Sequence, residues 1–515
     1  MSDFFGVVNF DDPPDRPFIA GDIRLDDRGA LRDDTDADVI LRAYERWGDE
    51  CVHHLLGDFA FAIWNGRELF CARDHFGVKP FYYARRGNTF VFSNAIAALR
   101  KHPIVTDAID DSAITDFLLF GWQQDRESTA FRDIRCLPAA HTLDARAMRM
   151  REYWTLPIEE PMRGDPVEGF RDVLARAVRD RTPEKVTVSL SGGIDSSAIT
   201  ALARDVTSDI DAYAIAFDSL IPDDERPFAT SIANHLGVRL HVIDGGAYRY
   251  FDSRVAREQP RNDPLDAISF DMHSAAAQRA NVMLAGQGGD AVMYASHSYF
   301  FNLLRRGRFI RFAREIAAYH RRPFGLRSSL RRALRFKKKM ETPPPWVKAR
   351  DVVDRWQRHF GDEEDIHPTR PQAYNILRDA GWQRLNEYLD PAAIGAPVEY
   401  RNPYLDVRVV RYVLRVPPMP WFAEKELLRA SMRGRLPENV RTRRKTALRV
   451  DPTHVLMTRQ ADELATIVQS CEALEPFVDR MQAAATIRSP QRTPFESYLL
   501  AFPLGLALWP ILKKR

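Results

Sequence analysis

The feature that most constrains the fold is a glycine turn between a short apolar, β-branched run and a helical pattern. The run covers residues 186–190, the turn reads Ser-Leu-Ser-Gly-Gly-Ile-Asp-Ser-Ser over 189–197, and the helical pattern follows over 196–206. A strand, a turn and a helix in this order present backbone N–H groups and the positive end of a helix dipole to a phosphate. The sequence therefore predicts an α/β unit that binds phosphate at this turn.

The side chains of the turn indicate which phosphate chemistry it serves. Gly192 and Gly193 allow the backbone to approach a ligand closely, and Asp195 supplies a hard oxygen ligand for Mg²⁺. Hydroxyl donors come from Ser191, Ser196 and Ser197. The turn lacks both the Gly-Lys-Ser/Thr of a P-loop and the Gly-x-Gly-x-x-Gly of a dinucleotide site. We therefore expect a pyrophosphate loop of a different kind.

Strand and helix patterns alternate downstream of the turn. Strands are expected at 186–190, 212–217, 239–243 and 282–285, and helices at 196–206, 226–236 and 267–280. This alternation predicts a doubly wound parallel sheet whose ligands bind beyond the carboxyl ends of the strands. The remaining third of the chain, to Arg515, has mostly helical patterns.

The first part of the chain has a different pattern. Short β-prone runs lie between turn signals such as Asn65-Gly66, with helical periodicity at 37–47 and 114–120. A Pro, Gly and Glu-containing stretch around 159–169 is typical of a linker. We therefore expect two domains, an α/β or β-rich one over 1–158 and a second over 166–515.

Composition excludes several classes of protein. The net charge of +3 gives no general argument for nucleic acid or membrane binding. Four cysteines are scattered without metal-site or disulfide spacing, which favours a reducing cytoplasm. No signal peptide is apparent at the N-terminus. The most apolar segment, 498–512, is too short to span a bilayer and contains two prolines, so we expect a buried terminal helix there.

Three further motifs accompany the turn, namely Gly-Gln-Gly-Gly-Asp at 286–290, Glu-Tyr-Arg-Asn-Pro-Tyr-Leu-Asp at 399–406 and Arg-Thr-Arg-Arg-Lys-Thr at 441–446. As an ordered set they resemble the synthetase domain of the glutamine-hydrolysing asparagine synthetase family, which includes β-lactam synthetases and lasso peptide cyclases. Residues 57–64 and 73–83 resemble that family's class II glutamine amidotransferase domain, which has an Ntn-type α+β fold. The resemblance covers nearly the whole chain.

The resemblance implies ATP as the activating nucleotide and Mg²⁺ held by Asp195 and Asp290. Lys445 would be the catalytic lysine, which steadies the pyrophosphate leaving group and the tetrahedral oxyanion, although the neighbouring arginines could do the same work. Glu399 or Glu387 could accept the proton of the attacking amine. The residues expected to bind ATP are Leu190, Ser191, Gly192, Gly193, Ile194, Asp195, Ser196, Ser197, Ile215, Ala285, Gly286 and Gln287.

By contrast, Lys425 lies in an amphipathic helical pattern. We expect it to tolerate replacement by alanine better than Lys445 does.

Two departures from the family pattern indicate a degenerate amidotransferase domain. Class II amidotransferases need a cysteine after the initiator methionine, where this chain has Ser2, and the family's Asn-Gly is replaced by Ala20-Gly21. We expect this domain to be retained for packing.

Gln287 stands where asparagine synthetases have Glu and β-lactam synthetases have Tyr, and glutamine cannot serve as a base. The Gly-x-Gly-Gly-Asp motif, residues 343–347 and the Pro-interrupted C-terminus are similar to lasso peptide cyclases.

The expected function is that of an ATP-dependent amide ligase that closes a macrolactam in a precursor peptide. An Asp or Glu side chain would be adenylated with release of pyrophosphate, and the peptide's N-terminal amine would attack it. The alternatives are an asparagine synthetase-like or β-lactam synthetase-like small-molecule ligase, an RNA-modifying enzyme that uses the same loop, and an inactive scaffold. The basic run at 305–339 is either a solvated face or a site for an acidic partner, such as the precursor or a companion maturation protein.

Overall fold

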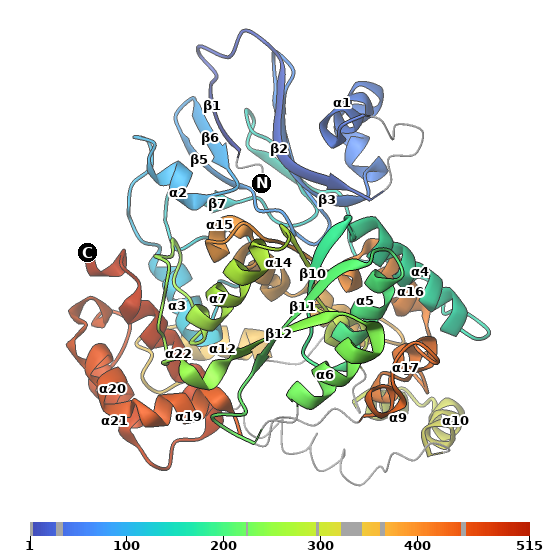
Figure 1. Cartoon of the computed structure of the whole chain (residues 1–515). Helices are drawn as coiled ribbons and strands as arrows, with labels where there is room; N and C mark the ends of the chain where they lie inside the picture. The colour runs from blue at the N-terminus through green and yellow to red at the C-terminus, as the bar shows by residue number, and fades with distance from the viewer. Residues whose placement is uncertain are drawn as a thin grey trace.

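Two antiparallel sheets form the N-terminal part of the molecule. The computed structural model describes residues 4–26, 34–222, 225–294, 298–320, 342–360, 366–443 and 450–514. One sheet has the order β1 (Phe5–Asn9), β6 (Thr89–Ser93), β5 (Tyr82–Arg86), β7 (Arg135–Cys136). The other has the order β2 (Phe18–Leu25), β3 (Gly57–Trp64), β4 (Leu69–Arg73), β8 (His141–Asp144), β9 (Arg149–Glu152). Figure 1 shows this sandwich above the rest of the chain.

Strand β3 is buried along nearly its whole length because both of its faces are covered. Ala60, Ala62 and Trp64 pack against the other sheet, while Phe59 and Ile63 face α1 (Asp36–Trp47) and η1 (Gly48–His54). This alternation follows the two-residue period of a strand. It explains why 59–64 is a continuous apolar run.

Strand β2 was not among the strands expected from the sequence. Gly21, Asp22 and Arg24 interrupt its apolar pattern, but its pairing with β3 runs unbroken from Phe18↔Trp64 to Leu25↔Gly57. Tertiary pairing therefore overrides local preference here.

The second part is built on a five-stranded sheet in which every neighbouring pair is parallel. Its order is β12 (Arg239–Asp244), β11 (Asp209–Ala216), β10 (Lys185–Ser189), β13 (Val282–Leu284), β14 (Glu399–Arg401). The predicted doubly wound parallel sheet is confirmed. The strand order reverses between β10 and β13, and such a switch point is where open α/β sheets bind ligands.

Helices cover both faces of this sheet (Figure 1). One face packs against α4 (Val167–Arg181), α5 (Ile194–Arg204), α6 (Glu225–Leu236), α16 (Val407–Arg415) and α17 (Glu426–Ser431). The other packs against α7 (Asp266–Ala277) and α15 (Pro391–Ile394). The connecting helices are α8 (Gly289–Val292), α9 (Ser298–Arg305), α10 (Phe309–His320), α12 (Val352–Phe360), α13 (Pro371–Arg378), α14 (Ala380–Tyr388), η3 (Pro403–Leu405), η4 (Ala423–Lys425) and α18 (Glu438–Arg441). Residues 321–339 of the basic run lie outside the described residues.

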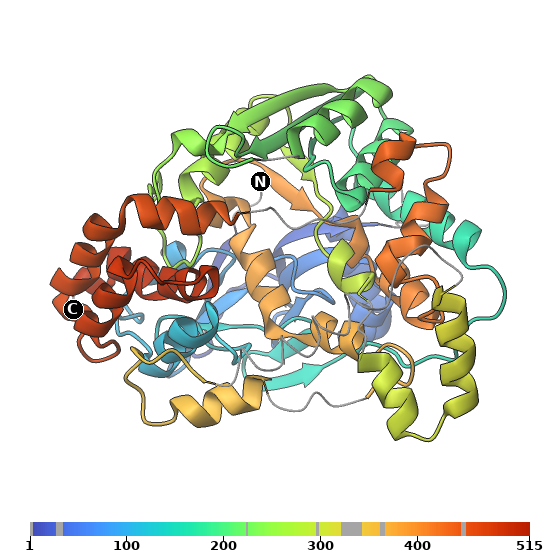
Figure 2. The same cartoon turned by 90° about the horizontal axis from the view of Figure 1, so that it is seen from below.

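A helical C-terminal part completes the chain, as expected. It contains α19 (Pro452–Arg459), α20 (Ala461–Ser470), α21 (Arg480–Arg488) and α22 (Pro494–Leu508), which gather at one side of the molecule (Figure 2). Helix α22 is buried from Leu499 to Ala507 and packs on α3 (Asp111–Phe120) of the N-terminal part. Among the described helices, none combines the length and the apolar character needed to cross a membrane.

Candidate active site

The glycine turn connects β10 to α5 at the switch point of the sheet. Gly192 has a φ of 76°, and a Cβ atom there would lie 2.9 Å from both the Glu225 carbonyl oxygen and the Ala229 nitrogen. Only glycine fits such a position. Gly193 precedes the first turn of α5, so the N–H groups at this helix N-terminus face the turn. The turn thus has the geometry of the predicted phosphate site.

Hydroxyl groups hold the turn in shape. The Ser196 Oγ accepts a hydrogen bond from the Ser191 N–H at 3.3 Å and lies 3.2 Å from the Ser191 Oγ. The Ser197 Oγ donates to the Gly193 carbonyl oxygen at 2.5 Å. These bonds tie the first turn of α5 to the glycines, which preorganises the loop before any nucleotide arrives.

The second loop, 285–290, lies directly against the first. A Cβ atom on Gly286 would be 2.7 Å from the Ser196 nitrogen, and one on Gly289 would be 2.8 Å from the Asp195 Oδ1. The glycines of the Gly-x-Gly-Gly-Asp motif are therefore required for this contact between loops. The structure brings together the two motifs that sequence analysis assigned to one site.

Asp195 and Asp290 converge on a lysine that sequence analysis placed elsewhere. The Lys425 Nζ forms ion pairs with the Asp195 Oδ2 and, at 2.5 Å, with the Asp290 Oδ1. The Lys425 side chain is 12% exposed, so its ammonium is enclosed in the site. The helical placement expected for Lys425 is wrong, because its backbone is left-handed. Its side chain bridges both predicted metal ligands, which favours a role in the site over tolerance of alanine.

The backbone at Lys425 differs from the helix that the sequence pattern predicts. Glu424 and Lys425 have φ values of 50° and 59°, in the left-handed region that non-glycine residues avoid. Such residues cost about 1–3 kcal/mol each and persist only where the surroundings impose them. The Arg429 Nε donates to the Glu424 carbonyl oxygen at 2.6 Å, and the Leu427 N–H donates to the Trp421 carbonyl oxygen at 2.7 Å. The chain is thus turned so that Lys425 points to the aspartates.

A buried arginine connects the segments that carry Asp290 and Lys425. The Arg370 guanidinium lies 3.3 Å from the centroid of the Phe422 ring and donates to the carbonyl oxygens of Val292, at the end of α8, and Val413. Burial lowers the pKa of Arg370 to about 9. A cation at the C-terminus of a helix interacts favourably with the helix dipole. Arg370 thus fixes the position of the segment that carries Asp290 relative to the segment that carries Lys425.

Four other residues expected to bind ATP lie at or just beyond the carboxyl ends of the central strands. Leu190 is fully buried within the core, so only its backbone can face a nucleotide. Ala285 is also buried, whereas Ile215 and Gln287 are partly exposed. Their contact with a nucleotide stays a prediction, and their positions beside the glycine turn agree with it.

Lys445 lies outside the described residues, which stop at Arg443 and resume at Val450. Its catalytic role therefore stays a prediction. The Arg443 guanidinium is 3.9 Å from the centroid of the Phe228 ring, and the Phe228 Cβ would be 3.0 Å from a Cβ on Gly192. The chain therefore enters the 444–449 segment beside the glycine turn.

Glu399 does not join the aspartates. It begins β14 and pairs with Val282, the first residue of β13, whereas the Gly286–Asp290 motif follows the carboxyl end of β13. Its carboxylate is 3.0 Å from the Lys79 Nζ and 3.0 Å from the Arg401 guanidinium. Burial raises its pKa, but these cations outweigh burial and lower the pKa to about 2. Glu399 is thus a weak proton acceptor in this geometry.

Glu387 lies on α14 at the junction of the two parts of the chain. Its carboxylate is 3.0 Å from the Arg73 guanidinium and 2.8 Å from that of Arg384. Burial raises its pKa, but Arg384 and Arg73 lower it to about 2. Acceptance of a proton by Glu399 or Glu387 stays a prediction, and the ion pairs favour structural roles for both.

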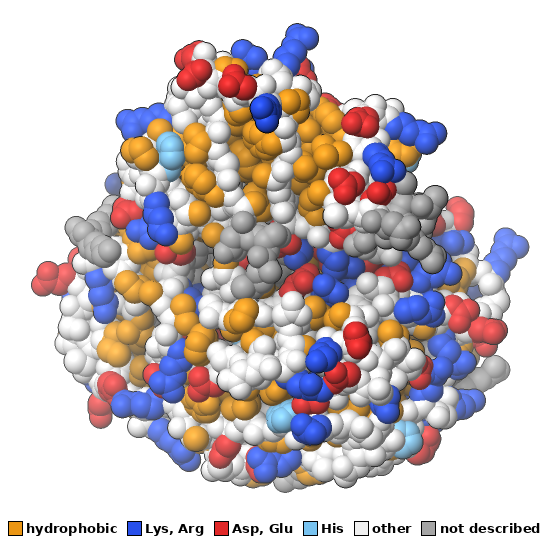
Figure 3. Space-filling model, turned by 45° about the horizontal axis from the view of Figure 1, so that its top comes forward, with side chains coloured by type: hydrophobic (Ala, Val, Ile, Leu, Met, Phe, Trp, Pro, Cys, Tyr) orange, Lys and Arg blue, Asp and Glu red, His pale blue; other side chains and the backbone are white. Residues whose placement is uncertain are grey.

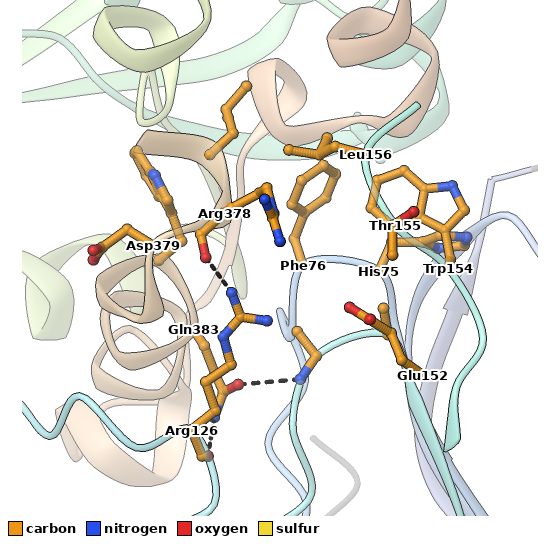
Figure 4. Close-up of a pocket in the computed structure, with 14 residues that line it drawn as sticks. His75, Phe76, Arg126, Glu152, Trp154, Thr155, Leu156, Arg378, Asp379 and Gln383 are labelled. Atoms are coloured by element: carbon orange, nitrogen blue, oxygen red, sulfur yellow. Dashed lines mark hydrogen bonds between the residues drawn. The ribbon is translucent and has the colours of Figure 1, made fainter. Parts of the chain in front are cut away.

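The neighbouring residues of α14 also contact the N-terminal part. The Gln383 Nε2 donates to the Arg126 carbonyl oxygen at 2.9 Å, and its Oε1 accepts from the Ala139 N–H at 3.1 Å (Figure 4). The junction leaves a pocket beside Gln383, with Phe76 and Trp154 on its wall (Figure 4). One face of α14 is therefore an interface between the two parts.

The donor set of the site suits Mg²⁺. Two aspartates face one enclosed cation, and among the described residues no group of three or more His, Cys, Asp or Glu side chains is placed so that it could hold a metal ion. A Mg²⁺ ion held by two carboxylates would complete its shell with phosphate oxygens and water. The carboxylates outweigh the Lys425 ammonium by one negative charge, and a divalent ion reverses that sign.

This charge balance predicts that binding of a nucleoside triphosphate depends on Mg²⁺. We expect the affinity for α,β-methylene-ATP, measured by calorimetry, to be at least about tenfold higher with Mg²⁺ than with EDTA, because the site alone repels a polyphosphate. Asp195→Asn should reduce this dependence. Equal affinities of the wild-type protein with and without Mg²⁺ would contradict the assignment of Asp195 and Asp290 to the metal.

The fold and the site together define a class of protein. A preorganised glycine loop at a switch point, two aspartates and an enclosed lysine form an α/β nucleotide-dependent synthetase, preceded by an amidotransferase-like sandwich. The family model for asparagine synthase matches residues 169–510, and the one for a glutamine amidotransferase domain matches residues 23–154. The chain belongs to the asparagine synthase family. It is an ATP-dependent carbon–nitrogen ligase.

The chain is similar to proteins named as asparagine synthetases and to proteins named as amidases. Glutamine-hydrolyzing asparagine synthetase 3 of Bacillus subtilis is 25% identical over 462 residues, which cover 80% of this chain and 70% of the relative. Glutamine-hydrolyzing asparagine synthetase 2 of the same species is 29% identical over 290 residues, covering 50% of this chain and 38% of the relative. Amidase chyE of Penicillium rubens is 27% identical over 304 residues, covering 50% and 42%.

Proposed function

We propose that this ligase closes a macrolactam in a precursor peptide, as lasso peptide cyclases do. It would adenylate an Asp or Glu side chain of the peptide, release pyrophosphate and join the carbonyl carbon to the peptide's N-terminal amine. AMP and the amine's proton leave in the second step. ATP is the co-substrate, and Mg²⁺ is its expected companion.

One contrast carries the proposal. The glycine turn at 191–197 and Asp290 keep the family pattern, whereas the amidotransferase elements do not. Ala20-Gly21 lies inside the β2–β3 ladder, where Gly21 pairs with Phe61, and Ser2 replaces the nucleophilic cysteine. A ligase that cannot take ammonia from glutamine needs another amine, and a peptide that carries both the acid and the amine supplies it.

The site residues have separate tasks in this reaction. The N–H groups at the start of α5 and the hydroxyls of Ser191 and Ser196 would bind the phosphates that become pyrophosphate. Lys425 would meet the negative charge that develops when the α–β phosphate bridge breaks. Asp195 and Asp290 would hold Mg²⁺, which neutralises charge on the triphosphate. Lys445 would stabilise the oxyanion formed as the amine attacks.

The face of the molecule drawn in Figure 3 fits a protein or peptide partner better than a polyanion. Figure 3 shows Lys and Arg side chains interspersed with Asp and Glu over the synthetase part, and bands of apolar side chains on the N-terminal part. Phe5 and Val7 of β1 contribute to the apolar surface, with exposures of 47% and 40%. A nucleic acid partner would favour a continuous basic surface. We therefore propose a peptide as the substrate and a companion maturation protein as a further partner.

A small-molecule ligase is the second candidate. The match of 80% of this chain to a glutamine-hydrolyzing asparagine synthetase favours it, since so long a match must extend into both parts of the chain. In that case an external amine or free ammonia, rather than the peptide's own terminus, would attack the adenylate.

The nucleotide products and the amine source test the proposal. With a linear precursor peptide and ATP, we expect AMP and pyrophosphate together with a peptide product lighter by one water, detected by mass spectrometry. Glutamine should not stimulate the reaction, and Ser2→Ala should leave it unchanged. The wild-type protein could instead release glutamate from glutamine, and Ser2→Ala could abolish that release. This result would contradict the interpretation that the amidotransferase domain is degenerate. Adenylation only of small acids, with free ammonia as acceptor, would select the second candidate.

A further inference from the structure

We propose that the N-terminal domain acts as a positioning element for the ATP loop, through a buried ionic cluster centred on Arg24, Asp26 and Asp58. The domain would set the position of the segment 383–406 in the synthetase part. That segment in turn contacts Asp195 and the Gly-x-Gly-Gly-Asp loop. This inference rests on the ligase assignment and not on the identity of the peptide.

The cluster joins β2 and β3 to the synthetase part. The Arg24 guanidinium is 2.6 Å from the Asp26 carboxylate and 2.6 Å from that of Asp58. Arg181, at the end of α4, is 3.1 Å from Asp26 and 2.6 Å from Asp406. The side chains of Asp26 and Asp406 are fully buried, and that of Arg181 is 3% exposed. Charges held out of water in this way depend on every partner being present.

Arg408 extends the cluster on the synthetase side. Its guanidinium is 2.7 Å from Asp406 and 2.8 Å from Asp180. Burial raises the pKa of Asp406, but Arg181 and Arg408 outweigh burial and lower the pKa to about 2. The carboxylate is thus charged at neutral pH and is held from both sides, by residues of α4 and of α16.

Two further ion pairs attach the same segment to the N-terminal domain. Arg73 of β4 binds Glu387, and Lys79 binds both Glu399 and Asp22 of β2. The N-terminal domain therefore contacts the 383–406 segment directly near its start and near its middle, and it reaches the end of the segment through Arg181, which pairs with both Asp26 and Asp406. Two direct charged attachments and one through Arg181 exceed what simple covering of an apolar surface needs.

The end of this segment contacts the ATP site directly. The Tyr404 Oη donates to the Asp195 carbonyl oxygen at 3.2 Å. Leu405 fills the space beside Gly288, where a Cβ atom would be 2.8 Å from the Leu405 Cδ2. Tyr404 and Leu405 immediately precede Asp406, so a shift of the buried carboxylate moves the residues that support both loops. The chain of contacts runs from Arg24 through Arg181 and Asp406 to Asp195.

The cluster begins close, in the sequence, to the element of the amidotransferase domain that has changed. Arg24 and Asp26 closely follow Ala20-Gly21, which replaces the Asn-Gly of the family's amidotransferase domain. The strand that no longer supports glutamine hydrolysis thus supplies charges that hold the synthetase. A domain without its own chemistry is retained because the other domain's loop depends on it.

Hydrogen exchange and nucleotide binding test this inference without any peptide substrate. We expect Arg24→Met to raise amide exchange in residues 190–197 and 403–406 by about tenfold and to weaken binding of α,β-methylene-ATP with Mg²⁺ by a similar factor, equivalent to about 1.4 kcal/mol. Arg24→Lys keeps the charge and should restore part of the affinity. Tyr404→Phe should reproduce the change in residues 190–197 without altering exchange in β2. Arg151→Met, which removes an exposed pair with Glu50 in the same domain, should change neither quantity.

The outcomes separate a positioning role from simple packing. Faster exchange confined to β2 and β3, with unchanged nucleotide affinity, would overturn the inference. Unchanged exchange of residues 190–197 in Tyr404→Phe would overturn its last step. Because the nucleotide analogue binds without a peptide, failure of the macrolactam proposal would leave these results unaffected.

Discussion

Lys425→Ala should lower the rate of AMP formation by about 10²–10³-fold, the effect of removing one donor that meets developing charge, about 3–4 kcal/mol. The Lys425 ammonium is enclosed between Asp195 and Asp290, where we propose that the triphosphate binds. A cation that stabilises the transition state more than the ground state affects turnover more than affinity. Single-turnover rates and calorimetric affinity for α,β-methylene-ATP measure the two effects separately.

Two variants separate the charge from the backbone. Lys425→Gly suits the left-handed φ of 59° but lacks the ammonium, so it should be as slow as Lys425→Ala and more stable. Lys348→Ala removes an exposed lysine paired with Glu475 and should keep wild-type turnover. If Lys425→Ala turns over normally, the ion pairs with the two aspartates serve only the nucleotide-free protein.

Arg73→Met should lower the free energy of unfolding by about 3–5 kcal/mol, the usual cost of leaving one partner of a buried ion pair. The Arg73 side chain is fully buried, and its guanidinium binds Glu387 together with the carbonyl oxygens of Gly77, Lys79 and Leu137. Methionine fills part of the volume but satisfies none of these acceptors. Denaturant unfolding followed by circular dichroism measures the change.

Arg149→Met is the matched control. Arg149 is 80% exposed in its pair with Asp144, and pairs of this kind contribute about 0–1 kcal/mol. A loss below about 1 kcal/mol in Arg73→Met would show that the junction between the two parts adds little to stability.

The elements with local signals were predictable from the sequence. Strand β10, the glycine turn and α5 follow from the order of apolar residues, glycines and small polar residues over 186–206, since each local preference agrees with the fold. The meeting of Asp195 with the 286–290 loop also follows, because parallel strands place their carboxyl ends at one edge. The helix α22 was expected from its apolar run.

The residues that could not be placed depend on long-range contacts. Glu387 and Glu399 bind residues 314 and 320 positions away in the chain, and no local pattern displays such a pair. Lys425 reads as helical because its neighbours do, while tertiary contacts reverse its backbone. Strand β2 has a weak local pattern and exists because β3 pairs with it.

The packing of α22 against α3 has a consequence for synthesis of the chain. The apolar face of α3, with Ile114, Phe117 and Leu118, packs in one cluster with Phe502 and its neighbours. At ribosomal rates of about 5–20 residues per second, about 20–80 s separate the appearance of the two helices. Throughout that interval the first domain presents an uncovered apolar helix, which favours aggregation or chaperone binding. A fragment that ends near residue 158 would keep that liability permanently, so the linker is not a boundary at which the protein can be divided.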